Sequence, residues 1–528
     1  IIAPGTVIVS SGGEVADVRK VVSPVMVNDK ATTLYHIDFS YDEQRLGGSA
    51  FAQTHGKVGD DVPTVKDPEY FRNAFNAVQE LIKQELVMAG HDISAGGLIT
   101  TLLEMTFANR EGGMNIDLSA FEGNDMVKIL FAENPGTVIQ IADSDIATVE
   151  ALLDKAEISY AQIGKPDPLR YIVVQKDSFC HCFDIDDMRN AWYETSHLLD
   201  RKQSFNGCAD ERAKNYKNQP LEMKFKEDFT GKLEQYGLGT LREERMLSVE
   251  RLALSENDSD KTSSLRSAPS GDAFEAKRRK NPHRSTLNLP KAAIIREKGT
   301  NGEREMAYSL WLAGFDVKDV MMTDLISGRE TLDEVNMIVF CGGFSNSDVL
   351  GSAKGWAGAF LFNPKAKEAL ERFYAREDTL SLGICNGCQL MVELGLLEEK
   401  EMRGANRDSK KRTRMLHNDS HKFESCFVSL AIPENKSVML SSLSGTKLGI
   451  WVAHGEGKFS LPEPEEKYNI IAKYNYHDYP GNPNGSDYDT AGICSKDGRH
   501  LAMMPHFERA IFPWQNAWYP QDRRKDEV

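Results

Sequence analysis

The sequence predicts an α/β protein with more than one domain, and three observations lead to this prediction. The 528 residues are too many for one compact core, so two or three domains are expected. From Lys291 onward, strand-like and helix-like segments alternate, which is typical of a mostly parallel sheet with helices on both faces. Residues 1–195 mix strands and helices less regularly, and residues 196–288 contain stretches rich in Ser, Asp, Glu, Lys and Pro.

Composition excludes several classes of protein. Apolar residues make up 41% and charged residues 27% of the chain, as in ordinary soluble proteins. The net charge of −16 argues against nucleic-acid binding, and no apolar run approaches the length of a membrane span. Eight scattered cysteines are typical of a reducing compartment, so we expect a cytoplasmic protein. The chain begins at Ile1 without Met or a basic leader and enters a strand-like run, Thr6–Ser10, so we expect a fragment without a visible targeting segment.

In the first region we expect a strand over Leu34–Phe39 and an amphipathic helix over Pro68–Met88. Asp67 suits the N-cap of this helix, Pro68 suits its first position, and Ala89-Gly90 is expected to close it. Its apolar residues recur at helical spacing: Phe71, Phe75, Val78, Leu81, Ile82 and Leu86. A second apolar helix is expected over Leu98–Phe107, with strands over Thr137–Ala142 and Arg170–Val174.

Two features of residues 170–288 invite a functional interpretation that we do not favour. Cys180-His181-Cys182 suggests a metal site, but no second pair has zinc-type spacing. Strand alternation puts both thiols on one face, so we expect them to be packing residues. Residues 196–288 are interpreted as a connector with partial helix and a mobile insertion that includes Ser255–Asp260 and Ser263–Gly271. The basic run Lys277–Lys280 is expected to be a solvated part of this linker.

In the region after Lys291 the expected strands and helices alternate, as in βαβ units. Strands are expected over Ala292–Arg296, Val317–Met322, Met337–Cys341, Leu380–Ile384 and His500–Met504, and helices over Gly302–Ala313 and Pro364–Tyr374.

The strongest chemical signal is the pattern Gly383-x-Cys385-x-Gly387, placed between a buried strand and a helix that is expected to start near Gln389. The two glycines leave room for a tight turn that lifts the thiol to the carboxyl edge of the sheet. The helix N-terminus favours the thiolate, and the Asn386 N–H is expected to point where an oxyanion would form. Taken alone, Cys385 could be a buried small hydrophobe, and Cys388 is expected to be one.

Two further segments supply partners for such a thiol. His506 and Glu508 follow the His500–Met504 strand at i and i+2, so His506 can accept the thiol proton while Glu508 orients the ring. A buried strand also runs into Gly342-Gly343, where the Gly343 and Phe344 amides could supply a second oxyanion donor. An ordinary βα turn is the alternative for this glycine loop.

Further upstream, Asp92 and Ser94 offer hard oxygens suited to Mg²⁺ and phosphate. Gly96 and Gly97 open a helix whose free N–H groups could face phosphate oxygens. Read alone, this pattern is as often an N-cap and turn as a ligand site.

The glycine loop Gly342-Gly343, the Cys385 elbow and the His506–Glu508 pair, in this order, resemble the class I glutamine amidotransferases. Further motifs resemble the large, single-chain phosphoribosylformylglycinamidine synthases of purine biosynthesis. The resemblance covers nearly the whole chain and is weakest over residues 230–285. The motifs that carry it are Arg45–Ala50, Ala89–Gly97, Leu102–Met105, Ala293–Gly302, Cys341–Asp348, Leu382–Gln389, His454–Gly457, Asn482–Ser486 and Met504–Arg509.

The resemblance implies a domain organisation and a reaction. Residues 1–33 would be the tail of an N-terminal synthetase subdomain, 34–195 an α+β subdomain of the aminoimidazole-ribonucleotide-synthetase fold, 196–288 the connector, and 289–528 a flavodoxin-like glutaminase. The family converts formylglycinamide ribonucleotide, ATP and glutamine into the amidine, ADP, phosphate and glutamate. The missing N-terminal synthetase half would be the partner, so the fragment alone is expected to hydrolyse glutamine at most weakly and to make no amidine.

The resemblance also implies roles for individual residues. Cys385 would be the nucleophile, His506 the base and Glu508 its orienter. Asp92 would bind magnesium and Ser94 the nucleotide at an auxiliary ADP/ATP site, whose other metal ligands would precede residue 1.

The sequence departs from the family pattern at two places. Phe507 replaces a proline between His506 and Glu508, and a freer backbone could misplace Glu508. His417 and Cys426 stand in a segment where arginines are expected near the glutamine site. Two alternatives therefore stay open: another class I amidotransferase that feeds a different synthetase, or a non-catalytic module that docks on or regulates the synthetase half.

Overall fold

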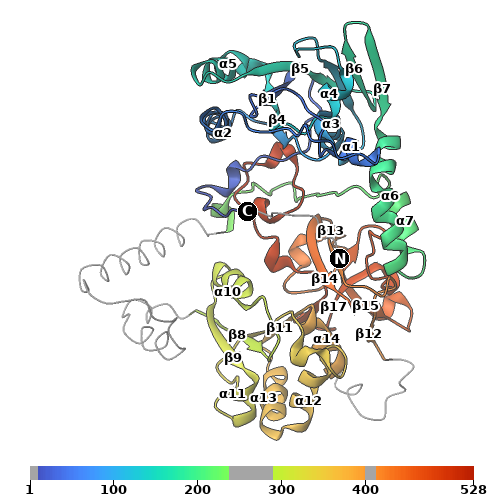
Figure 1. The fold of residues 1–528 in the computed structure, drawn as a ribbon. Helices are drawn as coiled ribbons and strands as arrows, with labels where there is room; N and C mark the ends of the chain where they lie inside the picture. Colours follow the sequence, from blue (N-terminus) through green and yellow to red (C-terminus); the bar gives the residue numbers. More distant parts are fainter. Residues whose placement is uncertain (1–9, 237–288, 399–411) are drawn as a thin grey trace, which may run out of the picture. The chain divides into compact units, whose positions relative to one another are not determined.

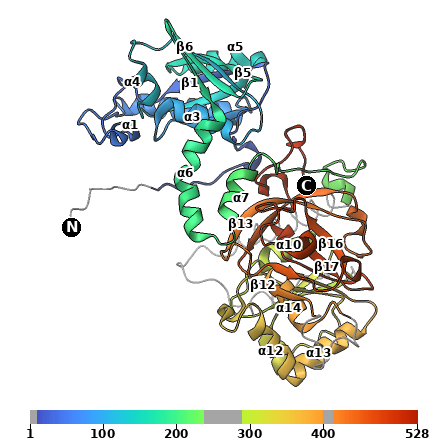
Figure 2. The same cartoon turned by 90° about the vertical axis from the view of Figure 1, so that its right-hand side faces the viewer.

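A computed structural model describes residues 10–236, 289–398 and 412–528. The chain forms two compact units, Ile1–Leu198 and Leu199–Val528, which are drawn from two directions in Figures 1 and 2. Most of the Thr6–Ser10 run, the proposed insertion and the basic run Lys277–Lys280 lie outside the described residues. The predicted boundaries at residues 33, 195 and 288 stay predictions. Within the described ranges, every helix is too short or too polar to cross a bilayer.

The first unit is built on one seven-stranded sheet with the order β2-β4-β1-β5-β3-β6-β7. Only β3 and β6 pair in parallel within it, so the unit is α+β. Its strands are β1 Thr32–Asp38, β2 Ala89–Asp92, β3 Gly113–Asp117, β4 Gly136–Ala142, β5 Tyr160–Asp167, β6 Tyr171–Lys176 and β7 Phe179–Asp184. Its helices are α1 Ala50–Thr54, α2 Pro68–Lys83, α3 Gly97–Phe107, α4 Met126–Phe131 and α5 Ile146–Lys155, and α6 Ile185–Gln203 crosses into the second unit.

Strand alternation gives this sheet two apolar faces. Tyr35 and Ile37 of β1 pack in one core with residues of α2 and α5. Leu34 of the same strand packs on the other side, in a core with residues of α3 and α4. Helices therefore cover both faces.

Helix α2 confirms the predicted start and corrects the predicted end. The Asp67 side chain accepts N–H bonds from Glu69 and Tyr70, and Pro68 occupies the first turn. The helix stops at Lys83 rather than Met88, because Ala89 is already buried in β2 opposite Gln140 of β4. Phe75, expected on the apolar face, is 48% exposed.

The cysteine pair of β7 is not a packing element. This strand lies at the edge of the sheet, and Cys180 and Cys182 are both exposed, which contradicts the packing role expected from sequence. In the part of the chain that the structure describes, no three potential metal ligands gather.

The second unit has a nine-stranded sheet with the order β14-β13-β16-β17-β18-β11-β10-β8-β9. Its strands are β8 Lys291–Arg296, β9 Asp316–Met321, β10 Met337–Phe340, β11 Leu380–Ile384, β13 Glu424–Ala431, β14 Lys447–His454, β16 Asn469–Tyr474, β17 Thr490–Cys494 and β18 His500–Met503. A separate ribbon pairs β12 Arg414–Leu416 with β15 Lys458–Ser460. The helices named here are α7 Cys208–Asn215, α10 Glu303–Leu312, α11 Met322–Ser327, α12 Lys354–Phe362, α13 Pro364–Ala375 and α14 Asn386–Leu394.

Five neighbouring strands of this sheet form the predicted parallel arrangement. Strands β9-β8-β10-β11-β18 are parallel, and their order is that of flavodoxin-like folds. Strands β17, β16, β13 and β14 extend the sheet by antiparallel pairing, which the sequence did not lead us to expect. The carboxyl ends of β8, β10, β11 and β18 meet at one edge, where open α/β sheets bind ligands.

Candidate active site

A strained turn presents Cys385 at this edge. Strand β11 ends at Ile384 and α14 begins at Asn386, three residues earlier than expected, so Cys385 itself is the helix N-cap, with φ 53° and ψ −108°. A side chain at Gly383 would come within 2.5 Å of the Gly387 carbonyl oxygen, and one at Gly387 within 2.0 Å of the Phe340 oxygen. The two glycines are thus required by close packing, and the strained backbone is that of a nucleophile elbow.

The side chain of Cys385 is buried. The side chain is 5% exposed, and the thiol lies 3.6 Å from the Ala453 carbonyl oxygen of β14. The Cys385 N–H donates to the Met503 oxygen of β18 at 3.0 Å, which ties the elbow to the strand that leads to His506. Cys388 is fully buried, and burial raises the pKa of its thiol well above the usual range, so it packs as expected.

His506 and Glu508 complete the arrangement. His506 Nδ1 donates to Glu508 Oε1 at 2.6 Å, and both residues are 2% exposed. Cys385 lies beside the same ring. Burial disfavours the charged ring, but the charge and hydrogen bond of Cys385 and those of Glu508 outweigh it and raise the pKa of His506 to about 9. The arrangement therefore favours the charged imidazolium form of His506.

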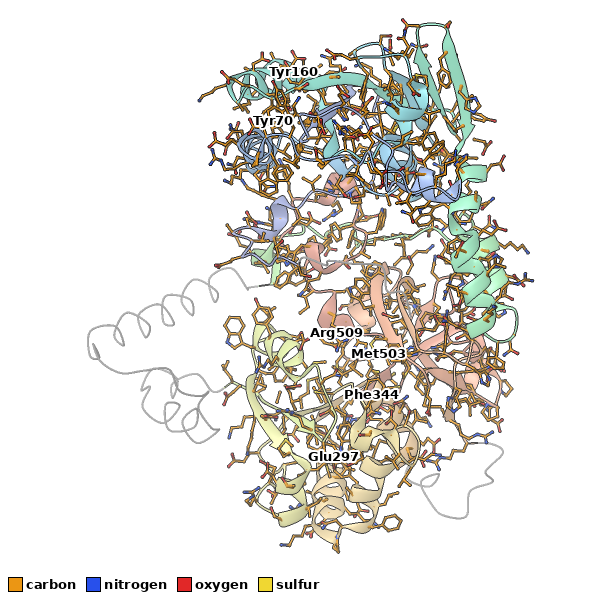
Figure 3. All side chains as sticks on the ribbon, viewed as in Figure 1. Tyr70, Tyr160, Glu297, Phe344, Met503 and Arg509 are labelled. Carbon is orange, nitrogen blue, oxygen red and sulfur yellow. The ribbon has the colours of Figure 1, made fainter. Side chains whose placement is uncertain are left out.

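The glycine loop after β10 lies against both reacting groups. A side chain at Gly342 would be 2.8 Å from His506 Cε1 and 3.3 Å from Cys385 Cβ. The Phe344 N–H donates to the Gly299 oxygen at 2.8 Å, so it is engaged and is a wrong choice for an oxyanion donor. Gly343, at φ 119°, and Asn386, at the first position of α14, remain the candidates. Figure 3 labels Phe344, Met503 and Arg509 in this part of the unit.

Comparisons with known proteins agree with this geometry. Residues 289–528 match the family model of the CobB/CobQ-like glutamine amidotransferase domain, and residues 40–175 match the C-terminal domain of AIR synthase related proteins. A probable phosphoribosylformylglycinamidine synthase of Arabidopsis thaliana, named as chloroplastic/mitochondrial, is 37% identical over 98% of this chain and 34% of its own length. The human phosphoribosylformylglycinamidine synthase is 36% identical over 98% of this chain and 37% of its own.

The chain is homologous to the phosphoribosylformylglycinamidine synthases. It spans about a third of the length of the curated relatives that it matches. Among solved structures, PurLQS from Thermotoga maritima is 28% identical, with a TM-score of 0.35, over 43% of this chain and 92% of that one.

The departures from the synthase pattern have different consequences. Phe507 lies in the short turn Phe507–Arg509 and leaves Glu508 bonded to His506, so the expected displacement is absent. His417 is exposed, with Nδ1 3.9 Å from Glu456 Oε1. Cys426 is half-buried on β13, and burial raises the pKa of its thiol to about 12. Neither side chain is the guanidinium group of the arginines expected there.

The sequence analysis included His454, the last residue of β14, in a motif but gave it no role of its own. Its ring is buried, and among the described residues neither ring nitrogen has a hydrogen-bond partner. Burial, followed by the nearby charge of His506, lowers the pKa of His454 to about 3. A side chain at Gly457 would collide with this ring at 2.2 Å, so the spacing His-x-x-Gly in the synthase motif His454–Gly457 was the available signal.

The upstream motif of the first unit does not form a metal and phosphate site by itself. The Asp92 side chain is 73% exposed and accepts a hydrogen bond from Ser94. The Gly96 N–H donates to Glu133 Oε1 at 2.8 Å and the Gly97 N–H to the Ser94 oxygen at 3.0 Å. Both amides are therefore engaged, and a carboxylate holds the helix end that we expected to bind phosphate. One exposed carboxylate does not fit a magnesium site.

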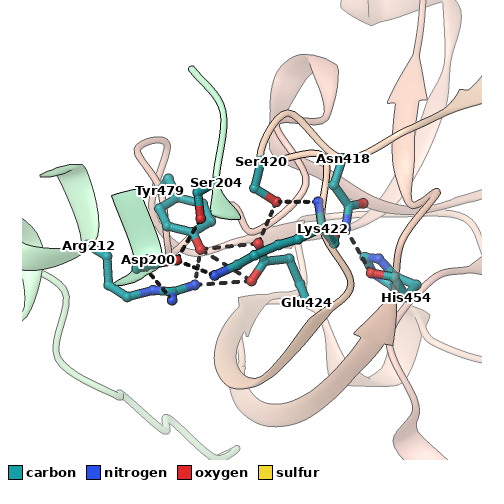
Figure 4. Close-up of polar contacts among 9 residues, drawn as sticks. All are labelled: Asp200, Ser204, Arg212, Asn418, Ser420, Lys422, Glu424, His454 and Tyr479. Carbon is teal, nitrogen blue, oxygen red and sulfur yellow. Dashed lines mark hydrogen bonds and ion pairs between the residues drawn. The ribbon is translucent and has the colours of Figure 1, made fainter. Parts of the chain in front are cut away.

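A buried ionic network supports the strand pair that ends at His454 (Figure 4). Arg212 of α7 binds Asp200 Oδ2 at 2.9 Å and Glu424 Oε2 at 3.1 Å, and it also contacts the Tyr479 hydroxyl. Lys422 binds Asp200 Oδ1 at 2.6 Å. Glu424 pairs with His454 in the β13–β14 ladder. The network thus anchors Asp200, near the end of α6, and helix α7 to the strands beside the active site.

Proposed function

We propose that this chain supplies the glutaminase and part of the synthetase of a phosphoribosylformylglycinamidine synthase. The whole enzyme would use glutamine and ATP to amidate formylglycinamide ribonucleotide in de novo purine biosynthesis. One observation carries the proposal for the glutaminase: a cysteine on a strained elbow lies beside a buried His506, which Glu508 holds at 2.6 Å. This is the arrangement of a nucleophile, a base and an orienting carboxylate.

In the first half of the proposed reaction, the Cys385 thiolate attacks the side-chain amide carbon of glutamine. The carbonyl oxygen becomes an oxyanion, and the Gly343 and Asn386 amides are the donors proposed to stabilise it; one such donor is typically worth about 100- to 1000-fold in rate. His506 then donates its proton to the departing nitrogen, so the C–N bond breaks and ammonia leaves. The product at this stage is a thioester between Cys385 and the glutamyl group.

In the second half, His506 is neutral and removes a proton from water, which attacks the thioester carbon. The tetrahedral intermediate expels the Cys385 thiolate and releases glutamate. Glu508 accepts from Nδ1 throughout, which keeps the other ring nitrogen directed at the reacting atoms and stabilises the charged ring.

The remaining assignments depend on relatives rather than on this site. ATP as co-substrate, formylglycinamide ribonucleotide as acceptor and the rest of the synthase as partner are proposed from the similarity to phosphoribosylformylglycinamidine synthases. The cytoplasmic location predicted from cysteine usage also stays a proposal, since one relative is named chloroplastic/mitochondrial.

The proposal is tested with a glutamine-mimicking diazo-ketone, which alkylates glutaminase nucleophiles. We expect one adduct on the 528-residue chain at Cys385, competed by glutamine. The matched control is Cys388→Ser, which removes the neighbouring buried thiol and should keep the adduct, whereas Cys385→Ser should lose it. No adduct at Cys385 in the wild-type chain would support the docking-module alternative instead.

A further inference from the structure

Two thiols that the proposed reaction does not use lie side by side on one face of strand β7. Cys180 and Cys182 are two residues apart in this strand, and both are exposed. They stand opposite Gln175 and Val173 of the neighbouring strand β6 in the antiparallel register of the pair. Since side chains two residues apart in a strand point the same way, both sulfur atoms lie on the same face of the sheet.

The other face of β7 holds the residues that alternate with the thiols. Phe179 and Phe183 pack against the core of the first unit. The His181 ring lies with them, its centroid 6.5 Å from that of Phe179 and 4.6 Å from that of Phe183. His181 therefore belongs to the face opposite the thiols and does not join them as a third ligand.

The carboxylate on the thiol face does not enlarge the site either. Asp117 of β3 stands opposite Gln175, so strand β6 separates it from Cys180 by about 10 Å. Its Oδ1 accepts the Ser119 N–H at 2.9 Å and the Ser119 hydroxyl at 2.5 Å. Over the described ranges, where no three potential ligands gather, the donor set at this place is therefore two thiols.

The spacing of the two thiols limits what they can form. Strand residues with one residue between them are about 6.6 Å apart, whereas a disulfide needs Cβ atoms about 3.8 Å apart. The pair therefore does not close on itself without bending the strand. One ion between two thiolates, with bonds of about 2.3 Å, sets the sulfur atoms about 4.6 Å apart. Each sulfur reaches that position by leaning about 1 Å toward the other, along the strand.

The number of ligands then selects the ion. Structural zinc and iron–sulfur clusters take four protein ligands, twice as many as this strand offers. Cu(I) is a soft cation that prefers thiolates, and two of them in a nearly linear arrangement satisfy it. We propose that Cys180 and Cys182 form a two-coordinate site for Cu(I), in which one ion replaces the two thiol protons. The inference does not depend on the proposed glutaminase function.

The test titrates the full 528-residue chain, free of oxygen, with Cu(I) held by a chromogenic chelator. We expect the wild-type chain to withdraw one ion from the chelator. Cys180→Ser and Cys182→Ser should each bind at least ~100-fold more weakly, because the second thiolate no longer closes on the ion from the same strand. One equivalent of Cu(I) should also slow iodoacetamide alkylation of both thiols together at least ~10-fold, measured by mass spectrometry of their peptide.

Two control variants separate this site from the other thiols. Cys426→Ser removes a half-buried thiol of the second unit and should bind Cu(I) as the wild-type chain does. His181→Cys combined with Cys182→Ser keeps two neighbouring thiols but puts them on opposite faces, so it should bind as weakly as Cys182→Ser. The three positions in β7 are exposed, so these variants should fold normally.

Three results would overturn the inference. Cu(I) affinity that is unchanged in Cys180→Ser, or lost in Cys385→Ser, would place the ion elsewhere. Wild-type affinity in the double variant would show that the shared strand face has no role. A dimer that forms with Cu(I) in size-exclusion chromatography would mean that two copies of the chain share the ion.

Discussion

Replacing Arg212 by Met should destabilise the second unit through one specific group, Glu424. Arg212 is the cation that binds both Asp200 and Glu424, whose side chains are only 8% and 3% exposed. Asp200 keeps Lys422 at 2.6 Å after the change. Glu424 keeps the Ser420 and Tyr479 hydroxyls but loses its ion pair, so one buried carboxylate is left uncompensated.

The expected loss of stability follows from the ion pair that is broken. Breaking a fully buried pair typically costs about 3–5 kcal/mol. The Arg212 side chain is 30% exposed, so water reaches the site and the expected loss is about 2–3 kcal/mol. Burial already raises the pKa of Glu424, and loss of Arg212 raises it further. Because protonated Glu424 carries no charge to bury, the loss should be complete at pH 8 and should shrink as the pH falls through the raised pKa.

The assay is urea denaturation followed by tryptophan fluorescence, since five of the six tryptophans lie in Leu199–Val528. Arg212→Met combined with Glu424→Gln removes the uncompensated charge and should recover at least half of the loss. Arg372→Met is the matched control, because its partners are more than half exposed, and it should stay within ~0.5 kcal/mol of wild type. The reasoning fails if Arg212→Met is as stable as Arg372→Met, or if the double variant recovers nothing.

Two further predictions concern the active site directly. Glu508→Gln keeps the shape of the side chain but removes the charge that helps to raise the pKa of His506 to about 9. The rate of glutamine hydrolysis should therefore fall ~100-fold or more, and the alkaline limb of its pH profile should move to lower pH. An alkaline limb at the wild-type position would contradict the role of Glu508. Gly387→Ala would place a methyl group 2.0 Å from the Phe340 oxygen. We therefore expect about 3 kcal/mol of destabilisation together with loss of diazo-ketone labelling at Cys385. Normal labelling of a variant with wild-type stability would show that the elbow is not as tightly packed as described.

The elbow and the parallel strands could be predicted because local patterns determine them. A buried strand, two glycines in close register and a following helix leave the chain few alternatives around Cys385, and β8, β10 and β11 fall within one residue of their expected bounds. His506 and Glu508 could be paired with Cys385 because the end of β18 lies at the same sheet edge as the end of β11.

What the sequence did not reveal depends on partners that are distant in the chain. The N–H of Phe344 is taken by Gly299, 45 residues earlier, and that of Gly96 by Glu133, so neither local glycine pattern showed that its amides were occupied. The end of α2 was misplaced for the same reason, since pairing of Ala89 with Gln140 ends the helix. The same limit hid the contact of Gln389, whose side-chain amide donates to the Glu456 carbonyl oxygen. Residues that perform chemistry at a strand end were therefore visible in the sequence, whereas those that hold them in place became visible only when tertiary contacts were known.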